Sequence, residues 1–217
     1  YRVEQDQFYS GEIYHVTVTP YPMGEGIKAE IPEISNAARY VYTGNILMTY
    51  EDKKFFEGGI RAVDPSFLQM FTFPLLQGDP ATALKNHHGI IISKEMAEKY
   101  FGSEDPLGKT LTANNEYLFT VTGVMAKVPT NSYLQFDMLI HFEFLKEIGR
   151  YNDSWGSNSI TTLVQLHTNA SIPEVNKKIT EIRHRHVLES IEDEEERQQY
   201  NKRKKTEFML MPFTDIH

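Results

Sequence analysis

The chain has 217 residues, 40% hydrophobic and 24% charged, which is enough to bury a core as one large domain or two small lobes. Its net charge of −8 argues against a nucleic-acid surface, and the basic cluster Lys202-Arg203-Lys204-Lys205 is partly neutralised by the acidic run 192–196. No run of 18 apolar residues exists to span a bilayer, and without cysteine the stability must come from core burial.

The first 63 residues predict strands around a helix. Alternating β-branched and polar residues over 13–20 predict a half-buried strand. Residues 26–40 place isoleucines at helical spacing around Pro32, which predicts a helix in two pieces or one that restarts after the proline. A strand pair at 46–50 and 55–63 follows.

From Asp64 the sequence becomes more aromatic, and residues 66–71 predict a short helix. The apolar residues 90–92 predict a buried strand that leads into a second helix. Ser93 is a suitable N-cap for that helix, and Gly102 is a suitable C-terminal stop.

A hairpin is predicted from 110–113 and 117–124. Apolar residues at every second position over 134–144 predict a strand that gives way to a helix near Glu143. Between these elements, Pro129, Asn131 and Ser132 predict a structural turn, because proline fixes the backbone and Asn and Ser side chains bond to nearby amides.

The last third repeats the opening pattern. Residues 160–166 predict a strand, a capping box at 171–174 begins a helix with an apolar stripe to Ile191, and 208–213 predict a final strand. The chain therefore has strand, helix and strand at each end, with a different α+β insert between them.

Residues 102–110 look like a phosphate-binding P-loop but do not fit one. Five residues separate Gly102 from Gly108-Lys109 where a P-loop has four, and the predicted order is helix then strand. A helix cap followed by a type I or II turn at Asp105-Pro106 explains the segment better.

We predict no catalytic, metal-binding or cofactor-binding residue. The pairs His87-His88 and His184/His186 have spacings that point the side chains apart, and no zinc ligand set accompanies them. There is no Gly-x-Ser-x-Gly elbow and no cysteine nucleophile.

A longer succession of motifs runs from Gly78 to Asp137. Its pieces are Gly78-Asp79, Ala83-Leu84, the strand 90–92, Ser93 with Ala97, Tyr100-Phe101-Gly102, Asp105-Pro106-Leu107-Gly108-Lys109, and the stretch from Gly123 to Asp137. This succession resembles the extracytoplasmic core domain of MacB/FtsX-type ABC transporter permeases. Val63 to Phe67, Trp155 and Pro212 to His217 extend the likeness over most of the chain. Lys127 and Tyr133 depart from it, because the family often has an acidic residue and a histidine there.

The resemblance implies an α+β fold of two lobes. A porter-like βαβ lobe would be built from both chain ends, 1–64 and 159–217, and a small inserted α/β lobe, similar to the one called Sabre, would occupy 65–158. Pro, Gly, Asn and Ser cluster at the junctions, which makes Asp64, Pro65, Asn152 and Gly156 our hinge candidates.

The resemblance also implies a noncatalytic domain at the periplasmic face of the bacterial inner membrane. Transmembrane helices would precede Tyr1 and follow His217 and would connect the domain to a cytoplasmic ABC ATPase. The domain would transmit ATP-driven motion to a periplasmic adaptor or substrate protein, in export or efflux. The transporter would be dimeric, or would pair this domain with a second one.

Two alternatives belong to other classes. A ligand-sensing or peptide- or lipid-binding module would need an apolar pocket, for which Phe55, Phe71, Tyr100 and Phe119 are candidates, although core packing explains them as well. Trp155 is either a partner anchor or a packing residue. A secreted hydrolase has little support, since no catalytic group stands out.

Overall fold

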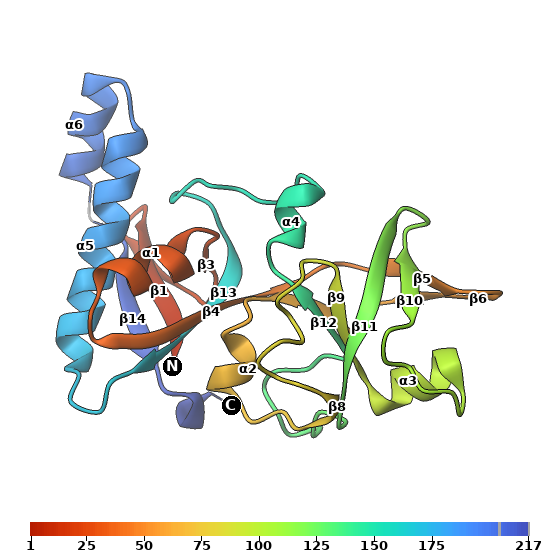
Figure 1. Cartoon of the computed structure of the whole chain (residues 1–217). Coiled ribbons are helices and arrows are strands. Elements are labelled where there is room, and N and C mark those ends of the chain that lie inside the picture. Colours follow the sequence, from red (N-terminus) through yellow and green to blue (C-terminus); the bar gives the residue numbers. More distant parts are fainter. Residues whose placement is uncertain (204, 217) are drawn as a thin grey trace. The chain divides into compact units, whose positions relative to one another are not determined.

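The computed structural model describes residues 1–203 and 205–216, so Lys204 of the basic cluster and His217 of the C-terminal motif lie outside the described residues. The chain forms two compact units (Figure 1): unit 1 comprises Tyr1–Arg39 and Tyr151–His217, and unit 2 comprises Tyr40–Arg150. These bounds differ from the predicted lobe bounds of 1–64 with 159–217 and 65–158. The assignment of porter-like and Sabre-like lobes stays a prediction.

Unit 1 combines a sheet with three α-helices. Its elements are β1 (Arg2–Tyr9), β2 (Glu12–Val16), β3 (Thr19–Pro20), α1 (Met23–Glu30), β4 (Ile34–Tyr42), β13 (Asn158–Leu166), α5 (Ile172–Ser190), α6 (Glu194–Lys202), β14 (Glu207–Met211) and the 3-10 turn η1 (Phe213–Asp215). The strand order is β14-β1-β13-β4, with β2 paired to β1 and β3 to β13. β4 continues into unit 2 at Tyr40.

The core of unit 1 lies where α1 and α5 pack on the sheet. It joins Val3 of β1, Ile27 of α1, Ile179 of α5 and Leu210 of β14 in one buried cluster. Trp155 packs against this cluster and stacks on the His186 ring at 4.3 Å between centroids. Trp155 is therefore a packing residue within unit 1, which was one of its two predicted roles.

Unit 2 contains a mixed sheet and three short helices. Its elements are β5 (Ile46–Tyr50), β6 (Lys53–Glu57), β7 (Ile60–Val63), α2 (Phe67–Met70), β8 (Leu75–Gly78), β9 (Gly89–Ser93), α3 (Lys94–Phe101), β10 (Thr110–Ala113), β11 (Tyr117–Met125), β12 (Met138–His141) and α4 (Phe144–Glu147). The order is β4-β7-β12-β9-β11-β10-β5-β6, with β8 on β11. β9 runs parallel to β11, and β12 runs parallel to β7.

Several predicted elements of unit 2 are confirmed. Ser93 caps α3, since its Oγ accepts a hydrogen bond from the Met96 amide at 3.2 Å, and Gly102 ends the helix with a positive φ of 64°. The hairpin of β10 and β11 also forms as predicted. The predicted strand 55–63 is divided into β6 and β7 at Gly58-Gly59.

The prediction of a helix restarting after Pro32 is wrong, because β4 occupies Ile34–Tyr42. Ile34 and Ala38 are four residues apart, a spacing that fits one face of a strand as well as one face of a helix. Residues 40–42 are Tyr-Val-Tyr, which favour a strand, and they pair with β7.

Three further predictions need correction. The strand predicted over 134–144 shrinks to β12, although Leu134 and Phe136 are buried as their pattern indicated. The Ser171 side chain makes no capping hydrogen bond at the start of α5. The final strand ends at Met211, and η1 follows.

No helix in the described ranges is long and apolar enough to cross a membrane.

Candidate functional site

The apolar stripe of α5 ends in a buried polar group. Val175, Ile179 and Ile182 are buried as predicted, and Arg183 and His184 directly after them are also buried, with 8% and 5% exposed. Arg183 Nη1 donates a hydrogen bond of 2.9 Å to the Tyr200 hydroxyl of α6. The same hydroxyl is also hydrogen-bonded to His184 Nδ1, so Tyr200 links both side chains to α6.

His184 is neutral in this arrangement. Its Nε2 lies 2.8 Å from the carbonyl oxygen of Thr206, which can only accept, so Nε2 carries the proton and Nδ1 accepts from Tyr200. Burial lowers the pKa of His184 to about 4, and the nearby cations Arg183 and Lys205 lower it as well.

Arg183 is a desolvated cation that has no counter-ion among the described residues. Burial lowers the pKa of its guanidinium, and it makes no ion pair with any carboxylate of the described chain. Its Nε is buried and has no hydrogen-bond partner among the described residues. A buried charge in this state is costly unless something pairs with it.

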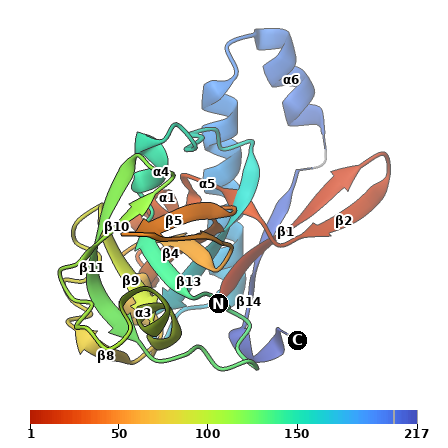
Figure 2. The ribbon, with the colours of Figure 1, turned by 90° about the vertical axis from the view of Figure 1, so that its right-hand side faces the viewer.

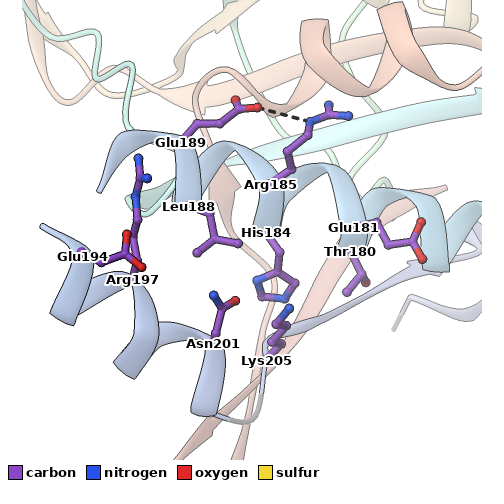
Figure 3. A pocket seen from close by; sticks show the side chains of 10 residues that line it. All are labelled: Thr180, Glu181, His184, Arg185, Leu188, Glu189, Glu194, Arg197, Asn201 and Lys205. Carbon is purple, nitrogen blue, oxygen red and sulfur yellow. Dashed lines mark ion pairs between the residues drawn. The ribbon is translucent and has the colours of Figure 1, made fainter. Parts of the chain in front are cut away.

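A cavity of about 660 Å³ lies between α5 and α6 (Figure 3). His184, Leu188 and Asn201 point into the space between the two helices, and the Arg185–Glu189 pair lies on the far side of α5. Charges of both signs line this cavity, so its lining does not select for one charge.

A second cavity, of about 700 Å³, lies between the β1–β2 hairpin and the two helices. Residues 8–13 of the hairpin form one wall, and Arg183, His184 and Tyr200 contribute to the other. Figure 2 shows the hairpin and α6 projecting on the same side of unit 1. Arg183, whose Nε has no partner among the described residues, therefore borders a space large enough for a small ligand.

Polar contacts hold α6 in place. No residue of α6 is buried, and its N-cap Asp193 accepts from the Glu196 amide at 2.8 Å. Arg197 Nε donates to the carbonyl of Ile191, just past the end of α5, at 2.6 Å. The position of α6 thus depends on Arg197 and on the Tyr200 group.

The hinge candidates lie in different units. Asp64 and Pro65 follow β7 inside unit 2, where the Asp64 carbonyl accepts from the Phe67 amide at 2.9 Å as the chain enters α2. Asn152 and Gly156 lie in unit 1, close to the start of its second segment at Tyr151. Their role as hinges stays a prediction.

Pro129, Asn131 and Ser132 lie in a turn of unit 2. The Ser132 amide donates to the Pro129 carbonyl at 2.9 Å. The Gln135 side chain donates to the carbonyls of Pro129 and Ser132 at 2.8 and 2.7 Å. The turn is thus braced by a residue that follows it.

The histidines of the two predicted pairs each contact different residues. The His87 ring packs on His141, His88 pairs with Glu147 at 2.9 Å, and His186 stacks on Trp155. Across the described ranges, no group of three His, Cys, Asp or Glu residues is placed to hold a metal ion.

The segment 102–110 is a cap and a turn. The Lys109 amide donates a hydrogen bond to the Pro106 carbonyl at 3.1 Å, and Gly108 has a positive φ of 77°. The turn therefore spans Pro106 to Lys109, one residue later than predicted. The Lys109 ammonium pairs with Glu104.

The four aromatic pocket candidates pack in three groups. Phe71 packs on Phe67, Tyr100 on Phe55, and Phe119 on Phe144. They do not converge on a single apolar cavity.

Sequence reasoning missed Arg183, Tyr200 and α6. A signal for Arg183 was available, because it follows Ile179 by four residues and so occupies a position of the buried stripe. A charged residue at such a position needs an explanation.

Comparison with protein families identifies the class. The family model of the MacB-like periplasmic core domain matches residues 2–182. The chain belongs to this family, which confirms the predicted resemblance: it is a periplasmic core domain of the kind found in ABC transporter permeases. The match ends at Ile182, so Arg183 and α6 lie beyond it.

Solved structures agree on the fold. A domain of a protein assigned as a permease, from Porphyromonas gingivalis, is 24% identical with a TM-score of 0.76 over 97% of this chain and 87% of that one. The periplasmic region of MacB from Actinobacillus actinomycetemcomitans is 14% identical, with a TM-score of 0.63 over 96% and 87%. The extracellular domain of the noncanonic ABC-type transporter YknZ from Gram-positive bacteria is 18% identical, with a TM-score of 0.61 over 97% and 100%. Comparison with curated proteins finds no match.

Proposed function

We propose that this domain is a noncatalytic transmitter of motion in an ABC transporter at the periplasmic face of the bacterial inner membrane. ATP binding and hydrolysis in a cytoplasmic ATPase would drive membrane helices, and the domain would pass their movement to a periplasmic adaptor or substrate protein, in export or efflux. The family membership supports the place of the domain in an ABC transporter. The strand arrangement of unit 1 supports its role in transmitting motion.

The pairing of β1 with β14 carries this proposal. The strands are antiparallel, with Arg2 opposite Met211, so the start of β1 and the end of β14 lie at the same end of unit 1. Figures 1 and 2 both show the N-terminus beside β14. Membrane helices attached at this end would both pull on one sheet.

The N-terminal connection is firmly held. The Tyr1 amine donates to the Val164 carbonyl of β13 at 2.9 Å, and Val3 lies in the core of unit 1. A displacement applied at either terminus would therefore reach the core through paired strands, because packed elements move as bodies and do not deform continuously.

Cell fractionation and co-purification test whether the domain belongs to a membrane protein that associates with an ABC ATPase. An antibody to this domain would be applied to fractions of host cells, and the detergent extract would then be affinity-purified. We expect a membrane band well above 25.1 kDa that brings down an ABC ATPase. A soluble band near the mass of this chain, with no ATPase, would overturn the proposal.

The alternative of a ligand-binding module is favoured by a specific observation: Arg183 lines a cavity, and its Nε has no hydrogen-bond partner among the described residues. The two roles are compatible, since a ligand that binds one arrangement of a moving domain would bias its motion.

A further inference from the structure

We propose that the cavity between the β1–β2 hairpin and α5–α6 binds a small amphiphilic anion, whose carboxylate or phosphate oxygens pair with Arg183 while its apolar part packs on the hairpin. This inference rests on the geometry of unit 1 and does not depend on the transport role.

Arg183 lacks a charged partner and an acceptor for its Nε among the described residues. Its Nη1 is engaged by Tyr200, but its Nε is buried without a partner in the described chain. Most buried polar groups in proteins are satisfied, and guanidinium groups prefer planar oxyanions that accept two parallel hydrogen bonds. A bound oxyanion would supply both the charge and the acceptor that Arg183 lacks.

Cations predominate among the charged residues that line the cavity. Among the described residues that line it, three are cations and one is a carboxylate: Arg183, Arg203, Lys205 and Glu12. Glu12 accepts from the Tyr14 hydroxyl at 2.8 Å, and His184 is kept neutral by burial. The cavity is therefore electropositive in a chain whose net charge is −8, which favours anionic ligands.

The hairpin wall of the cavity carries exposed apolar side chains. Phe8 and Ile13 lie directly opposite each other in the hairpin, and Ile13 is 62% exposed. The neighbouring Tyr9 is 73% exposed. Exposed apolar side chains beside a cavity are typical of a surface that packs on a ligand, so we expect the anion to carry a hydrocarbon part.

Nuclear magnetic resonance tests this directly. The Arg183 Nε–H signal of the ¹⁵N-labelled chain would be followed at pH 7 during titration with octanoate, acetate, octyl phosphate and inorganic phosphate. We expect saturable shifts with octanoate and octyl phosphate, and affinities at least fivefold weaker, by loss of buried hydrocarbon, for acetate and phosphate. The tighter of the two octyl compounds identifies the headgroup.

Matched variants complete the test. Arg183→Gln should weaken octanoate binding by about tenfold or more, the loss expected for a charge-assisted hydrogen bond. Arg185→Gln makes the same charge change two residues away, outside this cavity, and should alter affinity by less than about twofold.

Ile13→Asp provides a variant at an exposed position that does not disturb the core. It should weaken octanoate binding and leave the Arg183 signal of the free chain unchanged. Equal affinities for octanoate and acetate, equal effects of Arg183→Gln and Arg185→Gln, or no shift with any probe would overturn the proposal.

Discussion

At the scale of single residues, His184 makes the stability of unit 1 depend on pH. Its pKa falls from 6.5 in the unfolded chain to about 4 in the fold, so the unfolded state takes up a proton first as the pH drops. The stability is complete above pH 6.5 and is lost as the pH falls toward 4. The shift corresponds to a loss of at most roughly 3 kcal/mol.

Urea unfolding of the chain and of His184→Gln at pH 7 and pH 4.5 checks this. The wild type should lose more stability between the two pH values than the variant. His15 acts in the opposite direction, because its bond to Asp6 and contacts with Glu4 raise its pKa, so its contribution is present at low pH and lost as the pH rises. Equal losses in wild type and His184→Gln would show that His184 is not the group responsible.

Glu57 joins two side chains of α3 in unit 2. Its buried carboxylate accepts from Lys99 Nζ at 2.7 Å and from the Tyr100 hydroxyl at 2.5 Å, and burial together with this bond raises the pKa of Tyr100. Glu57→Ala leaves the buried Tyr100 hydroxyl unpaired and should reduce the free energy of unfolding by about 1–3 kcal/mol.

The exposed pair Lys94–Glu98 offers the control. Its atoms are 3.7 Å apart and both side chains are mostly in solvent. Glu98→Ala should change the stability by less than about 0.5 kcal/mol in the same thermal or urea measurement. A similar loss in both variants would contradict the role given to Glu57.

At the scale of elements, Gly78 fixes the join between β8 and β11. Its φ is +91°, and a Cβ there would lie 2.5 Å from the Thr122 carbonyl oxygen. Gly78→Ala should therefore destabilise unit 2 by about 1–3 kcal/mol, through backbone strain and displacement of β11. Thermal unfolding measures the loss.

Gly156→Ala is the matched substitution, because a Cβ at that position meets only the Ser154 Oγ at 3.5 Å. We expect little change in melting temperature. If the two alanine variants have the same melting temperature, the close contact of β8 with β11 does not restrict the residue at position 78.

Local sequence patterns predicted the elements whose signals lie within a few residues. Ser93 and Gly102 bounded α3, because caps depend on adjacent amides. β1 was missed because its sequence, Arg-Val-Glu-Gln-Asp-Gln-Phe-Tyr, is mostly polar, and its place in the sheet comes from pairing with β14 about 200 residues away. The Arg183 site was missed for the same reason, since the hairpin wall and α6 are distant in sequence.

At the scale of the whole molecule, the hinge residues define a prediction about motion between the two units. The chain has no cysteine, so spin labels can be placed at Lys177→Cys on α5 and Glu98→Cys on α3 without side reactions within it. If Asn152 and Gly156 are part of a hinge, the distance between the labels should differ between transporter states.

A pair of labels within unit 1, at Lys177→Cys and Glu12→Cys, is the control and should keep one distance. An unchanged distance between the labels on units 1 and 2 in every state would show that the domain moves as one body. That result would overturn the hinge prediction but would not contradict the proposed transmission of motion.

We propose that ATP binding and hydrolysis in the cytoplasm move this domain at the periplasmic face of the membrane. The most direct measurement is the distance between spin labels at Lys177→Cys in the two copies of the reconstituted parent transporter, first without nucleotide and then with ATP trapped. We predict a shift of the distance distribution that appears with trapped ATP and is absent with a partner that cannot bind ATP. The same distribution in all nucleotide states, repeated with the label at Glu98→Cys, would contradict the proposed transmission of motion.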